Sequence, residues 1–285
     1  MTASVQRGAA LLLVLWLITL LAALVGAFAL TARIEQQQGR VLSRGLAGDQ
    51  AARAGLEYAL SRLAASDPML QWQPDGRPYA WRFHGVDVEL RIVDETGKVD
   101  LNAADGTLLA ALLQSTGAEQ AVALQVAGAI VDWRDEDDFV QITGGAESAD
   151  YAAMGRPYGA KNAPFETVAE VEQVLGMTPA LYEAVAPYLT IHSRLPTPAP
   201  QFAQAPVLQA MGVEADPILA ARAATGAQLA GALLGGGSGT YSIESRARLP
   251  EGRTARLQAV VRTGGGAVPG TAYSVLRWEE GASPR

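Results

Sequence analysis

One uninterrupted apolar run near the start dominates the hydrophobic pattern of this chain. Residues 8–32 contain no ionisable side chain, and Thr19 and Thr31 are their only polar ones. Roughly 20 apolar residues suffice for a helix to cross a bilayer, because a helix satisfies its own backbone hydrogen bonds. The run therefore predicts one membrane-spanning helix.

Apolar residues continue at helical spacing after this run. Their separations stay near multiples of 3.6 up to about Ala65, and Asp67-Pro68 then ends the pattern. The residues that carry it are Ile34, Leu42, Leu46, Leu56, Leu60 and Leu63. The sequence thus predicts a single long helix, with its first half in lipid and its second half packed on a domain.

Alternation with a period of two replaces the helical pattern from Tyr79 onward. Apolar and polar residues alternate through residues 79–84 and, after Gly85, through residues 86–92. This pattern predicts a β-hairpin with one buried face. Three more strands are predicted near the C-terminus, at residues 240–249, 253–262 and 272–278.

Between these two groups of strands, residues 103–193 have helical character. Helices are predicted at residues 108–113, 118–131, 165–175 and 179–185. A proline-rich linker at residues 196–206 and a further helix at residues 216–234 follow. Strands on both sides of a helical block predict a sheet closed by distant segments, with the block inserted between them.

Composition narrows the classes of function. The chain has 285 residues, 49% of them hydrophobic, which is enough for one large core or two smaller ones. Its net charge of −7 offers no electrostatic footprint for nucleic acid, so the hairpin-like turn at residues 174–179 is interpreted as a packing turn. The chain has no cysteine, two histidines and no Gly-x-Ser-x-Gly motif, so we do not expect an enzyme.

A dense acidic cluster is the sharpest local signal. Seven carboxylates lie between residues 132 and 150 and face one cation, Arg134. They are Asp132, Asp135, Glu136, Asp137, Asp138, Glu147 and Asp150. Charges this dense repel one another unless water or a hard cation lies among them, and Ca²⁺ takes about 6–8 oxygen ligands. The residues alone leave three interpretations open: a solvated acidic loop, a Ca²⁺ site, or the metal site of a hydrolase.

The N-terminal run also has three interpretations. A secretory signal peptide would be cut near Ala29, and a plain single-pass anchor would keep Met1. A prepilin leader would be cut after Gly8, with the apolar helix kept at the new N-terminus. Counting the arginines around the span, Arg7 before it and three within residues 33–44, would put the long domain inside the cell. Large domains nevertheless translocate despite flanking charge.

The residues around the predicted cleavage point resemble those of a known family. Arg7-Gly8, followed by the apolar block from Ala9, is similar to the N-terminus of type II secretion minor pseudopilins, most closely the protein K family. Most pilins and pseudopilins carry Glu as the fifth mature residue; counted from Ala9 that position is Leu13, as the protein K family shows. The resemblance extends along nearly the whole chain. In the helical block it rests on residues 132–138, Gly145-Ala146-Glu147, Tyr151, Pro157-Tyr158 and Asn162.

The resemblance implies an α+β fold. A pilin-like long N-terminal helix would pack on an antiparallel sheet, which a large inserted all-α domain interrupts. The implied segments are a leader at 1–8, a transmembrane stem at 9–32, the pilin-like helix and first strands at 33–100, the inserted domain at 101–235 and the last strands at 236–285. The family binds calcium in the acidic region, which implies a structural Ca²⁺ here. The implied ligands are Asp135, Asp137, Glu147 and Asp150, with Asp138 and Asn162 as further candidates.

The resemblance also implies a function. Prepilin peptidase would cut after Gly8 and methylate the amine of Ala9, leaving a single-pass inner-membrane protein with its globular part in the periplasm. Leu13 stands in place of the Glu that would pair with a neighbouring subunit. The subunit would therefore leave no buried charge unpaired if no neighbour lay above it, as at the pseudopilus tip. Its partners would be the minor pseudopilins I and J. The alternative is a membrane-anchored, periplasmic Ca²⁺-binding interaction domain unrelated to a pilus.

Overall fold

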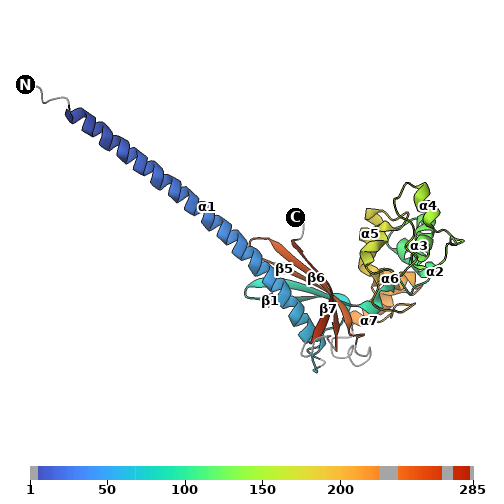
Figure 1. Cartoon of the computed structure of the whole chain (residues 1–285). Helices are drawn as coiled ribbons and strands as arrows, with labels where there is room; N and C mark the ends of the chain where they lie inside the picture. Colours follow the sequence, from blue (N-terminus) through green and yellow to red (C-terminus); the bar gives the residue numbers. More distant parts are fainter. Residues whose placement is uncertain (1–5, 68, 225–236, 265–271, 283–285) are drawn as a thin grey trace, which may run out of the picture. The chain divides into compact units, whose positions relative to one another are not determined.

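The computed structural model describes residues 6–67, 69–224, 237–264 and 272–282 (Figure 1). The chain divides into two compact units, Met1–Gln50 and Ala51–Arg285. Helix α1, Gln6–Leu63, runs for 58 residues and ends two residues before the predicted end. Within the described residues, Ala10–Leu30 is the one helical stretch long and apolar enough to cross a membrane. Its side chains are exposed, as expected of a span without its lipid.

Five antiparallel strands form the main sheet, in the order β1-β2-β5-β6-β7. Their bounds are β1 Asp75–Phe83, β2 Val86–Asp94, β5 Thr240–Arg248, β6 Thr254–Thr263 and β7 Tyr273–Ala282. Strand β2 alternates buried and exposed residues from Val86 to Asp94, in agreement with the period-two pattern. All five predicted strands are therefore confirmed.

The central pairing of this sheet joins β2 and β5. Asp94 faces Tyr241 at one end of the ladder, and Asp87 faces Arg248 at the other. The chain leaves the sheet after β2 and returns to it in β5. This confirms the predicted interruption of the sheet by an insertion, whose predicted end at residues 235 and 236 lies outside the described residues.

The last part of α1, from Ala51 to Leu63, packs on the sheet. Leu56 from the helix and Leu90 and Ile243 from the sheet are fully or almost fully buried in one cluster. Gly55 allows this close approach, because a Cβ there would lie 3.0 Å from atoms of Leu90 and would collide with the Ser245 hydroxyl. Of the residues that carry the predicted helical periodicity, Leu56 and Leu60 lie in this cluster and Leu63 packs against it, whereas Leu46 is 60% exposed.

The inserted block has its own apolar core. Its helices are α2 Gly106–Ser115, α3 Gln120–Arg134, α4 Ser148–Ala153, α5 Pro179–Val185, α6 Ala205–Ala210 and α7 Ala215–Ala224. Three 3-10 turns, η1 Glu95–Gly97, η2 Val168–Gln173 and η3 Ala186–Tyr188, and a parallel pair of short strands, β3 Val99–Asp100 and β4 Leu189–Thr190, complete it. Leu109, Leu112, Ile130, Trp133 and Tyr151 are buried in its centre.

The structure corrects two local predictions. Residues 165–175 form no α-helix but only the 3-10 turn η2, Val168–Gln173, whose N-cap is Thr167. Phe165 lies before this turn and is bonded to Asn102: its N–H donates to Oδ1 at 2.7 Å, and its carbonyl accepts from Nδ2 at 2.9 Å. The segment predicted as a linker, residues 196–206, enters helix α6 at its end. Helix α7 covers the start of the predicted helix at 216–234, and residues 225–234 lie outside the described part.

A buried ion pair lies where the inserted block leaves the sheet. Lys98 Nζ donates to Glu95 Oε1 at 2.7 Å, and both side chains are at most 10% exposed. The Glu95 carboxylate also accepts from Ser242 on β5 and from Thr190 on β4. Burial alone would raise the pKa of Glu95, but Lys98 and the two hydroxyls outweigh it and lower the pKa. This carboxylate therefore ties the block to the sheet as an anion.

Candidate metal centre

The acidic segment begins where helix α3 ends. Asp135 is the C-cap residue of α3, with an extended backbone, and its N–H donates to the Val131 carbonyl. The preceding Arg134 donates to the backbone carbonyls of Leu101 and Ala104. The one cation of the segment is thus bonded to carbonyls of another loop, and no hydrogen bond joins it to the carboxylates that follow.

Asp132 closes the loop that joins α3 to α4. Its buried carboxylate accepts from the Ala146 N–H at 2.8 Å and from the Gln141 N–H at 3.3 Å. The loop returns close to α3, since a Cβ on Gly128 would collide with the Gly144 carbonyl. Gly144 has φ +125°, a conformation that favours glycine. These contacts bring the end of the loop back to its beginning.

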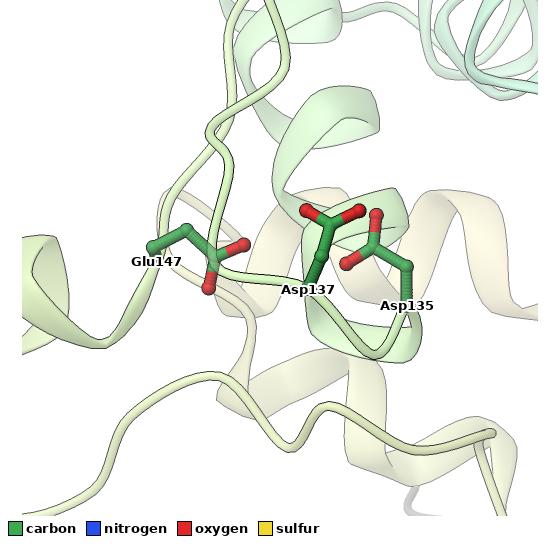
Figure 2. Close-up of side chains that lie close together, drawn as sticks. All are labelled: Asp135, Asp137 and Glu147. Atoms are coloured by element: carbon green, nitrogen blue, oxygen red, sulfur yellow. The ribbon is translucent and has the colours of Figure 1, made fainter.

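Three carboxylates meet as a result. Ligand oxygens of Asp135, Asp137 and Glu147 all lie within 4.8 Å of one another. Figure 2 shows the Glu147 side chain, from the segment before α4, pointing across toward Asp135 and Asp137 at the end of α3. Within the described residues no other group of three acidic or histidine side chains comes this close.

Several oxygens at this place are buried and have no hydrogen-bond partner. They belong to Asp135 (Oδ1), Glu147 (Oε1 and Oε2) and Asn162 (Oδ1). Asn162 has a left-handed backbone with φ 50°, and its Nδ2 donates to Asp138 Oδ1 at 3.2 Å. A buried acceptor without a partner is unfavourable by about 1–3 kcal/mol, and more when charged. Oxygen atoms in this state suit a hard divalent cation such as Ca²⁺.

The electrostatics point the same way. Burial, together with the charges of Asp132, Asp135 and two further aspartates, raises the pKa of Glu147 to about 7. Burial and Asp137 raise the pKa of Asp135, and burial is also the main cause that raises the pKa of Asp132. A bound cation would remove this repulsion and allow all the carboxylates to ionise.

Comparison with known proteins gives the family. Residues 89–194 match the family described as Type II secretion system (T2SS), protein K. Over 254 residues the chain is 30% identical to the Type II secretion system protein K of Klebsiella pneumoniae, covering 78% of this chain and 76% of that protein. The chain belongs to the type II secretion system protein K family. Its role is that of a minor pseudopilin in protein transport by type II secretion.

Two further likenesses accompany this membership in the protein K family. A stretch of 79 residues is 35% identical to the Type II secretion system protein K of Aeromonas hydrophila, covering 28% of this chain and 24% of that protein. The fold is similar to a chain of "the GspK-GspI-GspJ complex from enterotoxigenic Escherichia coli Type 2 Secretion System", with a TM-score of 0.54 and 19% identity over 88% of this chain and 99% of that one. The predicted α+β fold is thereby confirmed for this protein K family member.

The six predicted metal ligands of this protein K chain take different places. Asp135, Asp137 and Glu147 come together, and Asn162 adds an unpartnered buried oxygen. The Asp138 carboxylate instead accepts from the Asn162 amide. Asp150 instead caps helix α4, because its carboxylate accepts the N–H of Glu147 at 2.9 Å.

Asp132 belongs to the acidic run but is not among the ligands expected from the sequence. Its only distinguishing signal is its place between apolar residues near the end of a buried helix, beside Ile130 and Trp133. A carboxylate on the buried face of a helix needs local donors, and the returning loop supplies them as backbone N–H groups.

The N-terminal residues singled out by the sequence all lie in α1. Gly8 and Ala9 are in its first turns, and Leu13 follows on the apolar span, where its side chain is exposed. The apolar helix fits a single-pass membrane anchor. Processing and assembly at these positions stay predictions.

Proposed function

We propose that this minor pseudopilin caps the periplasmic tip of the pseudopilus, in a complex with the minor pseudopilins I and J. The observation that carries the proposal is the pairing of β2 with β5, which places a whole helical block between adjacent strands of a pilin-like sheet. A block of this size would obstruct the addition of a further subunit above it. The E. coli complex named above, whose chain has the same fold, supports the choice of partners.

The N-terminal helix supports the same position. Leu13 stands where most pilins and pseudopilins carry a Glu, which is thought to pair with the N-terminus of a neighbouring subunit. A buried charge without its partner is unfavourable, and a tip subunit has no such partner to satisfy. We therefore propose cleavage after Gly8, methylation of the Ala9 amine, and residence in the inner membrane with the globular part in the periplasm.

We also propose that the acidic centre binds one or more Ca²⁺ ions as a structural element. Its support is the convergence of Asp135, Asp137 and Glu147, together with the unpartnered buried oxygen of Asn162, whose amide is bonded to Asp138. The role proposed for the protein is assembly, without catalysis. Lys161 is the basic side chain nearest in sequence to Asn162. Its ammonium group donates to Glu170 and to the Pro164 carbonyl, so these partners already occupy it.

N-terminal processing tests the proposal in the native host. Intact mass and N-terminal sequencing of membrane-purified protein should give a chain that begins at Ala9, with or without one methyl group. Gly8→Ala should abolish this cleavage and the export of folded proteins. Gly26→Ala is the matched control, because a Cβ at Gly26 meets no atom within 4 Å.

Partner capture tests the tip position. The cleaved chain should co-purify with the minor pseudopilins I and J in a stoichiometric complex. Two results would instead favour a membrane-anchored periplasmic Ca²⁺-binding domain unrelated to a pilus. One is an N-terminus at Met1 or near Leu30; the other is normal protein export although the chain does not bind I and J.

A further inference from the structure

Three large apolar side chains stand in solvent on the loop between α3 and α4. Phe139 is 80% exposed, Val140 is 49% exposed, and Ile142 is fully exposed. We call these three residues the apolar tip. Several large apolar side chains exposed within four residues of one loop indicate an interaction site more strongly than a single exposed residue does.

The backbone under the apolar tip is held in place on both sides. The Phe139 N–H donates to Asp137 Oδ1 at 2.9 Å, and the Gln141 N–H donates to Asp132 Oδ1 at 3.3 Å. The Gly144 N–H closes a turn onto the Gln141 carbonyl at 3.2 Å. The loop could bury these side chains if it were free to collapse, but these bonds fix it with the tip facing outward.

The chain segment that carries the tip has charged side chains of one sign. Glu136, Asp137 and Asp138 precede it directly and are exposed, and residues 135–147 contain no lysine or arginine. Even with a cation on Asp137, Glu136 and Asp138 leave an acidic rim beside the apolar centre. Such a surface is complementary to an apolar pocket with a basic rim, and it is repelled by an anionic bilayer.

We infer that the apolar tip is a docking surface for a protein partner, whose pocket is lined by apolar side chains and rimmed by Lys or Arg. The inference goes beyond the proposed function, because the partner is a protein other than I and J. The tip and the proposed cation centre share one residue, since Asp137 Oδ1 accepts from the Phe139 N–H and Asp137 also belongs to the acidic cluster. The charge pattern favours this partner over a lipid surface. Phe139 and Ile142 are the side chains that would enter the pocket.

Site-specific photocrosslinking in the native host tests the inference on the full chain. Ile142 is replaced by p-benzoylphenylalanine, and Met154, which is 69% exposed and follows α4, is replaced in the same way as the control. The Ile142 position should give a protein adduct whose crosslinked peptide combines apolar residues with Lys or Arg. Phe139→Ser should lower the adduct yield by roughly 10-fold, the order expected for a large apolar side chain removed from a contact. Glu136→Lys should also lower it, because it reverses a rim charge.

Folding is monitored separately, so that a loss of adduct can be interpreted. The Phe139→Ser and Glu136→Lys proteins should keep the wild-type thermal midpoint and still co-purify with I and J, since both side chains are exposed. Four results would overturn the inference: no protein adduct at Ile142, lipid adducts in its place, the same adduct from Met154, or a yield unchanged by both substitutions. Loss of I and J binding in the unsubstituted chain would instead count against the proposed function.

Discussion

The Ala146 N–H donates to the Asp132 carboxylate at 2.8 Å and so joins the two ends of the acidic loop. Asp132 is fully buried on α3, while Ala146 immediately precedes the Glu147 carboxylate of the candidate metal centre. The bond places Glu147 opposite Asp135 and Asp137. One carboxylate that is not itself a proposed ligand thus sets the distance between those that are.

Asp132→Asn should weaken Ca²⁺ binding although Asp132 is not in the cluster of ligands. The amide keeps the size of the side chain but offers one acceptor oxygen where the carboxylate offers two, so one of the bonds to Gln141 and Ala146 is weakened. We expect a loss of about 10–100-fold in Ca²⁺ affinity, the range typical of residues that orient ligands. Isothermal titration calorimetry measures it, with exposed Glu136→Gln as the control of equal charge change. Equal affinities for the two variants would contradict this role.

The proposed ligands should separate into two classes on substitution. Asp135→Asn, Asp137→Asn and Glu147→Gln should each abolish the rise in thermal midpoint that Ca²⁺ gives the wild-type protein, because ligand binding stabilises only the folded state. Asp150→Asn should retain most of that rise, because Asp150 caps α4. Its cost is the loss of part of a helix cap, about 0.5–2 kcal/mol. If Asp150→Asn abolished the Ca²⁺-dependent rise in thermal midpoint as fully as the other three substitutions, Asp150 would be a ligand.

The raised pKa of Glu147 predicts that, as the pH rises, the stability of the cation-free protein falls while its affinity for Ca²⁺ increases. In the cation-free protein this pKa is about 7 against an ordinary 4.5, so between these values the folded chain holds a proton that the unfolded chain releases. The cation-free protein should therefore lose stability as the pH rises through this window. Ca²⁺ needs the ionised carboxylate, so its affinity should rise over the same window and level off above about pH 7.

Calorimetry in two buffers of different ionisation enthalpy measures the proton released when Ca²⁺ binds. Thermal unfolding of the cation-free protein across the window measures the stability trend. Glu147→Gln should remove the contribution of this residue from both. A Ca²⁺ affinity that does not change with pH through the window would show that Glu147 is already ionised or is not a ligand.

Gly128→Ala should open the acidic loop. The added methyl group would collide with the Gly144 carbonyl, a backbone atom that cannot rotate away. We expect a destabilisation of about 1–3 kcal/mol, as for overpacked cores, together with loss of Ca²⁺ binding. Gly106→Ala is the matched control in the same block, because its Cβ would make an ordinary 3.7 Å contact with Val131. Chemical denaturation with and without Ca²⁺ distinguishes the two; similar curves would argue against the close approach.

Lys98→Met should destabilise the junction between the block and the sheet. It would leave the Glu95 carboxylate buried without its cation, which is typically unfavourable by about 3–5 kcal/mol. Glu95→Gln combined with Lys98→Met should recover part of the loss, because no uncompensated charge remains. Denaturant unfolding of the single and double variants measures the difference. A double variant no more stable than Lys98→Met alone would mean that packing, and not charge, accounts for the effect.

The sequence by itself determined the local elements and the composition of the site. The apolar run before Leu30, the period-two strands and helices such as α5 Pro179–Val185 follow from burial patterns within each segment. The acidic residues 132–138 are neighbours in the chain, so their repulsion and their suitability for a cation were visible without coordinates. The family resemblance added the pilin-like order of elements.

The tertiary structure alone decided which distant groups meet. Periodicity reports that a residue is buried but not against what, so it could not give the register that sets Asp94 beside Tyr241. The α-helix predicted at residues 165–175 is only a 3-10 turn at Val168–Gln173, and Asn102, far away in sequence, is bonded to both backbone groups of Phe165 before it. The role of Asp132 likewise depends on a returning loop. Hydrogen bonds between remote segments are satisfied only once the chain is folded, and they decide the geometry of this site.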